Sequence, residues 1–220
     1  MNDTATRMIE ISQDGAGLVL IEDSYHGGFY TEDVQTCIVY CFRGSEGLCV
    51  IHDTGQIAIG DIVSLVRRIG RIESVAAAQR SAFRSRLQDV EHEKRRVDVF
   101  RRLGWKGGIQ RVDAPEGWVA FPRSGEPVTM DRSGMIIEKL PERTRRMEVN
   151  VLNNMFSAPN SQTVRVDLQY SGSRHTPLPI LAFRTEDMEA KARRKSESGD
   201  PDYLSELATA RRMGLLEGGE

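Results

Sequence analysis

Two short apolar runs separated by a glycine-flanked turn constrain the fold of this 220-residue chain more than any other feature. The runs are TCIVYCFR (36–43) and LCVIH (48–52), both rich in β-branched and aromatic residues, and the turn between them is GSEG. Such residues favour strands, and a four-residue connection with glycine at both ends is typical of a β-hairpin. The sequence therefore predicts an antiparallel hairpin over residues 36–52.

The turn also predicts the register of this hairpin. If Arg43 lies opposite Leu48, the alternation of side chains along a strand places Cys37 and His52 on the same face as diagonal neighbours. Diagonal positions of an antiparallel pair lie about 7–8 Å apart, so long side chains at these positions can meet. Cys37 also lies where a polar loop enters the strand, and backbone N–H groups at such a point can hold an oxyanion.

The hairpin contains all three cysteines of the chain, and they have three interpretations. A zinc site would use Cys37, Cys41, Cys49 and His52, but the register places Cys49 on the opposite face, so four ligands cannot converge. In the second interpretation Cys37 is a nucleophile and His52 is its base. In the third interpretation the hairpin is part of the hydrophobic core, since cysteine packs as a small hydrophobe. This interpretation describes Cys41 and Cys49 well, and for Cys37 both it and the nucleophile interpretation remain.

The segment TEDVQTCIVYCFRGSEGLCVIHDTG (31–55) resembles the hairpin of a superfamily of cysteine deamidases. Its members are the cytotoxic-necrotizing-factor-type glutamine deamidases, the chemoreceptor glutamine deamidase CheD and the protein N-terminal asparagine amidohydrolases. In them a nucleophilic cysteine opens a strand, a second strand brings a histidine, and a threonine or serine commonly lies six positions before the cysteine. Here Thr31 lies six positions before Cys37 and His52 lies fifteen after it. The more usual SGC or GSC of the family is QTC here.

The resemblance implies that Cys37 is the nucleophile, that His52 is the base and that Thr31 supports the histidine. The implied reaction is the hydrolysis of a glutamine or asparagine carboxamide, without a cofactor, in a protein substrate. A bacterial enzyme acting on its own proteins and an exported toxin or effector both fit this chemistry. Two alternatives remain: a thiol protease, transglutaminase or small-molecule amidase with the same dyad, and a non-catalytic protein-binding module. Asp33 and Asp53 are further candidates to orient His52, although Asp33 fits a turn cap better.

The rest of the chain predicts a mixture of strands and helices. Strands are expected within GLVLIED (17–23), residues 108–131, GMIIEKL (134–140), TVRVDLQYSG (163–172) and PLPILAFR (177–184). One helix is expected to start after Asp61 as N-cap and to stop at Gly70, and a longer one to cover 72–103. Residues 1–17 are expected to be weakly ordered, and 24–35 to form a loop.

The expected fold is therefore α+β, with a layered, β-sandwich-like core of mixed strands flanked by helices. Residues 1–184 are expected to form the catalytic domain, and residues 185–220 a helical C-terminal appendage.

Composition and motifs narrow the function classes. A net charge of −2 gives no reason to expect a nucleic acid or an anionic membrane as partner, and no apolar run has the length of a membrane span. The sequence contains no nucleotide-binding loop and no metalloprotease motif, so no cofactor or metal is predicted. The polar, acid-containing N-terminus is not a secretory signal, which favours a cytoplasmic location or export by a specialised machine. An odd cysteine count favours a reducing compartment, and the oligomeric state is not predicted.

Overall fold

The computed structural model describes residues 6–23, 27–55, 57–81, 86–140, 166–172, 174–175 and 197. The chain divides into two units, and every helix and strand named below belongs to the first, which comprises Met1–Pro141 and Gln162–Pro177. The expected strand over 177–184, the expected domain boundary after residue 184 and, apart from Glu197, the expected helical appendage lie outside the described residues.

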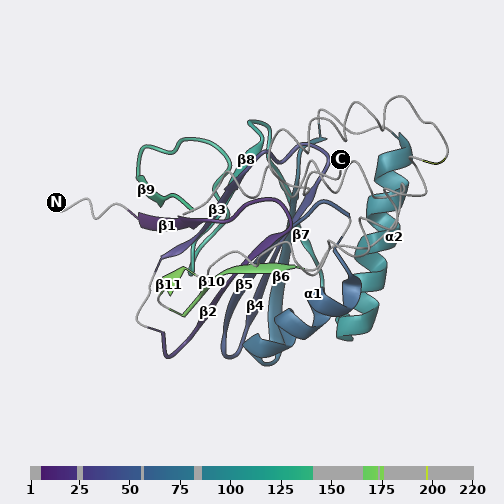
Figure 1. Cartoon of the computed structure of the whole chain (residues 1–220), viewed down its shortest axis with the longest axis horizontal. Coiled ribbons are helices and arrows are strands. Elements are labelled where there is room, and N and C mark those ends of the chain that lie inside the picture. Colours follow the sequence, from purple (N-terminus) through teal and green to yellow (C-terminus); the bar gives the residue numbers. More distant parts are fainter. Residues whose placement is uncertain are drawn as a thin grey trace. The chain divides into compact units, whose positions relative to one another are not determined.

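The described strands form two sheets (Figure 1). The four-stranded sheet has the order β8-β3-β1-β9 and consists of β1 (Thr6–Glu10), β3 (Gly28–Glu32), β8 (Trp118–Phe121) and β9 (Met135–Glu138). The seven-stranded sheet has the order β11-β10-β2-β5-β4-β6-β7 and consists of β2 (Gly15–Leu20), β4 (Ile38–Gly44), β5 (Gly47–Asp53), β6 (Ile72–Gln79), β7 (Gln110–Asp113), β10 (Asp167–Ser171) and β11 (Arg174–His175). Both sheets mix parallel and antiparallel pairs, so the predicted mixed α+β class is confirmed.

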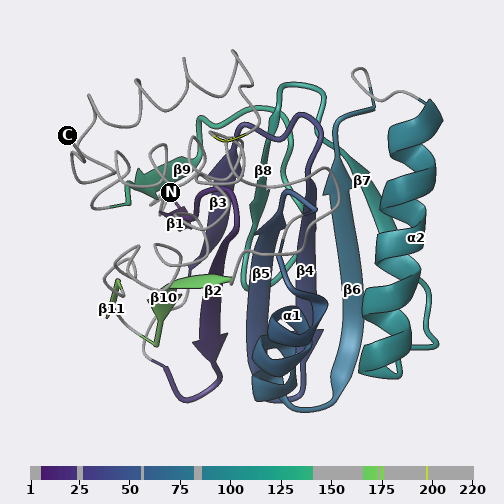
Figure 2. The same cartoon turned by 45° about the vertical axis from the view of Figure 1, so that its right-hand side comes forward.

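The seven-stranded sheet is covered on both faces. One face packs against the helices α1 (Ile59–Val66) and α2 (Arg86–Leu103), through side chains that include Tyr40, Phe42 and Ile51. The opposite face packs against the four-stranded sheet, through side chains that include Val39 and Val50. Because both faces of β4 and β5 are buried, the two strands read as nearly continuous apolar runs rather than as alternating ones. Figure 2 shows the two helices and the strands of this sheet from a second direction.

The predicted hairpin and its register are confirmed. Strands β4 and β5 pair antiparallel with Arg43 opposite Leu48 and Val39 opposite His52. The hairpin lies at the centre of the seven-stranded sheet, because β5 also pairs with β2 and β4 also pairs with β6. The Arg43 guanidinium ties the turn end of the hairpin to the loop after β8, where it donates to the backbone carbonyls of Pro122 at 2.7 Å and Gly125 at 3.1 Å.

The expected helix over 72–103 is wrong in its first part. Residues 72–79 form strand β6 and the helix begins only at Arg86. Along β6, Val75 and Ala77 face the helices, whereas Ala76 and Ala78 face the four-stranded sheet. Alanine favours helices locally, but here β6 pairs with β4 between the helices and the four-stranded sheet, and this pairing prevails. Strand β6, helix α2 and the parallel strand β7 then form a crossover unit.

Two further expectations for the N-terminal third are also wrong. Residues 6–10 form β1 rather than a weakly ordered start, and residues 28–32 form β3 rather than a loop. These strands pair in parallel with one another, and β1 pairs in parallel with β9, more than a hundred residues away in the sequence. Such partners leave no local pattern, because a parallel pair is joined by a long connection instead of a turn.

The first helix differs from its prediction at one end only. It begins at Ile59, with Ala58 as N-cap, so Asp61 lies within the first turn instead of capping the helix. A 3₁₀ turn over Arg67–Ile69 follows, and Gly70 ends it with a positive φ of 72°, as the sequence predicts.

Among the described residues, no helix is both long and apolar enough to cross a membrane.

Candidate active site

A histidine and a threonine from the two sheets meet between them. Thr31 lies on β3 in the four-stranded sheet, His52 lies on β5 in the seven-stranded sheet, and Thr31 Oγ1 is 2.7 Å from His52 Nδ1. Both residues are buried, with exposed fractions of 1% and 0%. The structure therefore brings together two of the three residues that the sequence analysis singles out. The hydrogen bond at Nδ1 fixes the plane of the imidazole and directs Nε2 away from Thr31.

Cys37, the third of these residues, lies directly before β4 at the end of the loop that joins the two sheets. Its neighbour Ile38 pairs with Asp53, the residue that follows His52. The cysteine is 6% exposed, whereas the two preceding residues, Gln35 and Thr36, are exposed. Cys37 thus lies at the boundary between a solvent-exposed loop and the core, close in register to His52.

The surroundings of Cys37 favour the neutral thiol. Burial raises the pKa of Cys37 to about 12, and the negative charges of Asp14 and Asp53 act in the same direction. Hydrogen bonds from the backbone of Gln35 and the side chain of Thr36 lower the pKa of Cys37 by a smaller amount. At neutral pH the thiol therefore keeps its proton unless a base removes it during a reaction.

Asp14, one of the two carboxylates that raise the pKa of Cys37, was not expected at this site. It lies just before β2 with a positive φ of 54° and an exposed fraction of 1%. Its Oδ1 accepts hydrogen bonds from the backbone N–H of Thr54 at 3.2 Å and from the Thr54 hydroxyl at 2.6 Å. In the sequence Asp14 precedes a glycine and resembles any turn residue, so no local signal identifies it.

Asp53, a candidate to orient His52, instead forms a buried ion pair with Arg95 of α2. Arg95 Nε lies 2.6 Å from Asp53 Oδ2, and Arg95 Nη2 lies 2.8 Å from Asp53 Oδ1. The same guanidinium donates to the carbonyl of Ile57 at 2.5 Å, and Asp53 Oδ1 also accepts from the N–H of Gly55. The partner of His52 Nδ1 is therefore Thr31, while Asp53 anchors the helix to the end of β5.

Asp33, the other aspartate weighed for this role, has a positive φ of 62°. Aspartate tolerates this left-handed conformation better than most residues, in agreement with a turn position in the loop between the sheets.

The remaining two cysteines lie on opposite faces of the hairpin. Cys41 is buried between the sheets and Cys49 is buried against the helices. The four residues considered for zinc therefore do not converge on one point. In the part of the chain that the structure describes, no group of three or more His, Cys, Asp or Glu side chains could hold a metal ion.

Comparison with known proteins adds no relative to this picture. No model of a known protein family matches the chain, and a search of the curated proteins finds no match. The structure itself defines an α+β protein with one helix layer and two sheet layers. Its candidate site is a Thr31–His52 pair between the sheets, with Cys37 at the loop that joins them.

Replacing Thr31 by valine, which has nearly the same shape, is expected to lower the free energy of unfolding by about 1–3 kcal/mol. The change removes the hydroxyl at 2.7 Å from His52 Nδ1 and leaves a buried polar atom without this partner. Urea unfolding measures the loss. Thr31→Ser keeps the hydroxyl and is the matched control. A loss in Thr31→Ser without a loss in Thr31→Val would mean that the methyl group, and not the hydrogen bond, supports the histidine.

The free energy of unfolding is also expected to fall as the pH rises above about 9. Burial raises the pKa of Cys37 and of Cys41 from the ordinary thiol value of 9.0 to about 12, and that of Cys49 higher still. A thiol whose pKa is raised by folding stabilises the protein fully below its unfolded pKa, and this contribution is lost as the pH rises through the folded pKa. Each buried thiol adds a slope of up to about 1.4 kcal/mol per pH unit in that window.

Urea unfolding between about pH 8 and pH 10, below the main titration of tyrosine, measures this slope. Cys41→Ala removes one of the three thiols and is expected to reduce the slope by about a third, whatever stability it costs at neutral pH. A slope that stays the same in this variant would show that other groups cause the pH dependence.

Proposed function

We propose that this chain is a cofactor-free cysteine amidohydrolase, which converts the carboxamide of a glutamine or asparagine side chain into a carboxylic acid. The observation that carries the proposal is the contact of 2.7 Å between Thr31 Oγ1 and His52 Nδ1, at a hairpin whose first strand follows Cys37. The resemblance of residues 31–55 to the hairpin of the cysteine deamidases assigns the same three residues to catalysis.

The hydrogen bond to Thr31 gives His52 one defined ring orientation. When Nδ1–H donates to Thr31 Oγ1, Nε2 carries the lone pair and acts as the base. Nε2 takes the proton of Cys37 while the sulfur attacks the carboxamide carbon, and the carbonyl oxygen takes up the negative charge. Backbone N–H groups of the loop before Cys37 stabilise that charge.

The second half of the reaction returns the protein to its starting state. His52 gives its proton to the amide nitrogen, the C–N bond breaks, ammonia leaves, and a thioester remains on Cys37. A water molecule then attacks the thioester, His52 takes one of its protons, and the C–S bond breaks to release the carboxylic acid. Protonation of the sulfur by His52 completes the cycle.

The raised pKa of Cys37 suits a general-base mechanism of this kind. With a pKa of about 12, the free protein does not store a reactive thiolate, and the nucleophile forms only as His52 accepts the proton. This behaviour protects the resting enzyme against oxidation and alkylation. It also predicts that the reactivity of Cys37 depends strongly on His52.

A protein substrate follows from the resemblance to the deamidase superfamily. Cys37 adjoins an exposed loop, where a glutamine or asparagine side chain of another protein can reach it more readily than at a deeply buried site. The same chemistry serves a bacterial enzyme that modifies its own proteins and an effector that modifies those of a target cell.

A non-catalytic binding module is the second candidate function, and the low exposure of Cys37 favours it. All three cysteines are buried, with exposed fractions of 6%, 1% and 0% for Cys37, Cys41 and Cys49. In that case Cys37 is a core residue, and the surface around the loop binds a partner without chemistry.

Alkylation by iodoacetamide under native conditions separates the two functions. The amidohydrolase proposal expects Cys37 to react before Cys41 and Cys49, because it adjoins an exposed loop and lies close in register to His52. His52→Ala is expected to slow the reaction of Cys37 and to leave the other two cysteines unchanged. Peptide mass spectrometry measures the order of modification. Simultaneous labelling of the three cysteines, or none before unfolding, supports the binding module instead.

A further inference from the structure

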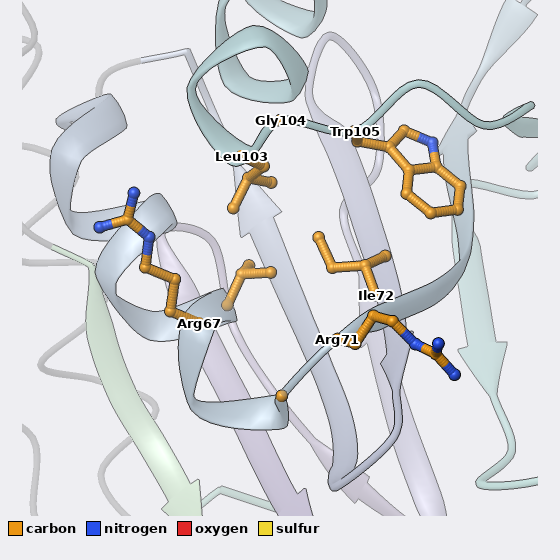
Figure 3. A pocket seen from close by; sticks show the side chains of 8 residues that line it. Arg67, Arg71, Ile72, Leu103, Gly104 and Trp105 are labelled. Carbon is orange, nitrogen blue, oxygen red and sulfur yellow. The ribbon is translucent and has the colours of Figure 1, made fainter.

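A pocket of about 240 Å³ opens at the end of the seven-stranded sheet that is remote from Cys37 (Figure 3). It lies where the 3₁₀ turn after α1, the start of β6 and the end of α2 meet, and it is lined by Val66, Arg67, Gly70, Arg71, Ile72, Leu103, Gly104 and Trp105. Ile72 pairs with Gly44 at the far end of β4, so the pocket lies about 20 Å along the sheet from Cys37. It is therefore separate from the candidate active site.

Apolar side chains line part of this pocket because the core reaches the surface here. Ile72, Leu103 and Trp105 are only partly buried, and all three pack against the hydrophobic cluster between the helices and the seven-stranded sheet. Figure 3 shows their side chains around the opening. Sites for whole small-molecule ligands usually have about 300–1,000 Å³, so this pocket has the size for one bulky apolar side chain.

Two arginines flank the opening of the pocket, and the Glu46 carboxyl group lies beside Gly70 of its lining. Figure 3 shows the side chains of Arg67 and Arg71 on two sides of the opening, with their guanidinium groups directed outward. Arg71 has a distant ion pair with Glu73, at 3.6 Å, and its side chain is 84% exposed. Among the described residues no ion pair involves Arg67. Exposed Arg68 and Arg102, next in sequence to residues of the lining, extend this charge beyond the pocket.

We propose that this pocket anchors an acidic segment of a partner protein. One bulky apolar side chain of the segment enters between Ile72, Leu103 and Trp105, and flanking carboxylates pair with Arg67 and Arg71. A buried apolar anchor concentrates binding energy at protein interfaces, and complementary charges beside it add specificity. The small volume and the extent of the charge favour a peptide segment over a compact small molecule.

Tryptophan fluorescence tests the proposal directly, because the chain has two tryptophans and only one of them lines the pocket. Trp118 is fully buried, so a change on titration reports Trp105. The probe is a short acetylated, amidated peptide with one phenylalanine between pairs of acidic residues. It is expected to change the fluorescence saturably and to bind more weakly as salt is added. Replacing its phenylalanine by alanine, or its acids by lysine, is expected to raise the Kd about tenfold or more.

Charge reversal on the protein gives the matched comparison. Arg67→Glu and Arg71→Glu are each expected to raise the Kd of the acidic peptide about tenfold or more. Arg111→Glu changes an equally exposed arginine, 76% exposed, on β7 outside the pocket and is expected to leave the Kd unchanged. All three arginines are exposed, so circular dichroism should show an unchanged fold.

Three results would overturn this assignment. The first is an equal Kd for the acidic and the lysine peptides, or an equal effect of Arg111→Glu. The second is the same fluorescence change with benzoate at the same concentration, which would make the pocket a small-anion site. The third is the absence of binding in both fluorescence and calorimetry. Cys37→Ala is expected to leave the Kd of the acidic peptide unchanged. A failure of the peptide-binding proposal can therefore be distinguished from a failure of the amidohydrolase proposal.

Discussion

Replacing Cys37 by alanine is expected to lower the rate of ammonia release from a carboxamide substrate by at least about a thousandfold. Without the sulfur no thioester forms, and the other groups of the site can only bind the substrate. His52→Ala is expected to cause a loss of similar size, because a thiol with a pKa of about 12 needs a base to become a nucleophile. The two changes together should cost no more than either alone, since the residues act as a unit.

The measurement combines two readouts on a panel of proteins that contain glutamine and asparagine. A coupled assay follows the ammonia, and mass spectrometry follows the gain of about 1 Da that accompanies conversion of an amide to an acid. Together they separate deamidation from proteolysis, which cuts the chain, and from transglutamination, which adds an amine. Thr31→Val should reduce the rate and Thr31→Ser should largely preserve it, because only the valine variant lacks the hydroxyl at His52 Nδ1.

Cys41 and Cys49 provide the controls for the cysteine variant. Cys41 lies in the cluster between the sheets and Cys49 in the cluster beneath the helices, so Cys41→Ala and Cys49→Ala remove a buried thiol without touching the proposed nucleophile. Both variants should keep the activity under conditions in which they are folded. Ammonia release that survives in Cys37→Ala, or that is lost equally in all three variants, would rule out the assigned nucleophile.

The second large effect is expected for stability: Arg95→Ala should lower the free energy of unfolding by about 3–5 kcal/mol. The Asp53 side chain is fully buried at 0% exposure, and the Arg95 side chain is only 8% exposed. Removing the guanidinium leaves the Asp53 charge in the core, where the N–H of Gly55 is a weak substitute, and also frees the carbonyl of Ile57. Urea unfolding at neutral pH measures the loss.

Arg101→Ala is a matched control on the same helix. Arg101 also forms an ion pair, with Asp98 at 2.7 Å, but its side chain is 72% exposed. Solvent screens such a pair, so the variant should lose less than about 1 kcal/mol. Asp53→Asn combined with Arg95→Ala should recover part of the loss, because the neutral amide is cheaper to bury than the charge. Equal losses in Arg95→Ala and Arg101→Ala would show that the burial of the pair does not matter.

The sequence predicts the hairpin well because its determinants are local. Two β-branched runs and a glycine-flanked turn define the strands, and the turn length sets the register that places Val39 opposite His52. The same register separates Cys41 from Cys49. The position of Thr31 is different: only the resemblance singles it out, whereas the local pattern predicts a loop where β3 lies.

The contacts that complete the site are not accessible to a local reading of the sequence. Asp53 and Arg95 are 42 residues apart, and Asp14 and Thr54 are 40 residues apart, so no periodic pattern relates them. The alanine-rich β6 shows the same difficulty, because alanine favours a helix locally and only the distant pairing with β4 makes the segment a strand. Parallel partners such as β1 and β9 are not joined by a turn, so no turn motif in the sequence predicts their pairing.

Because the chain crosses from one sheet to the other at the candidate site, partial unfolding should affect this site early. Thr31 is fixed to one sheet, His52 belongs to the other, and Cys37 ends the connection that crosses from the first to the second. The distance between the two sheets therefore sets the distances between the residues of the candidate site. Mild denaturant or heat that loosens the interior should abolish the proposed amidohydrolase activity while far-ultraviolet circular dichroism still reports intact strands and helices.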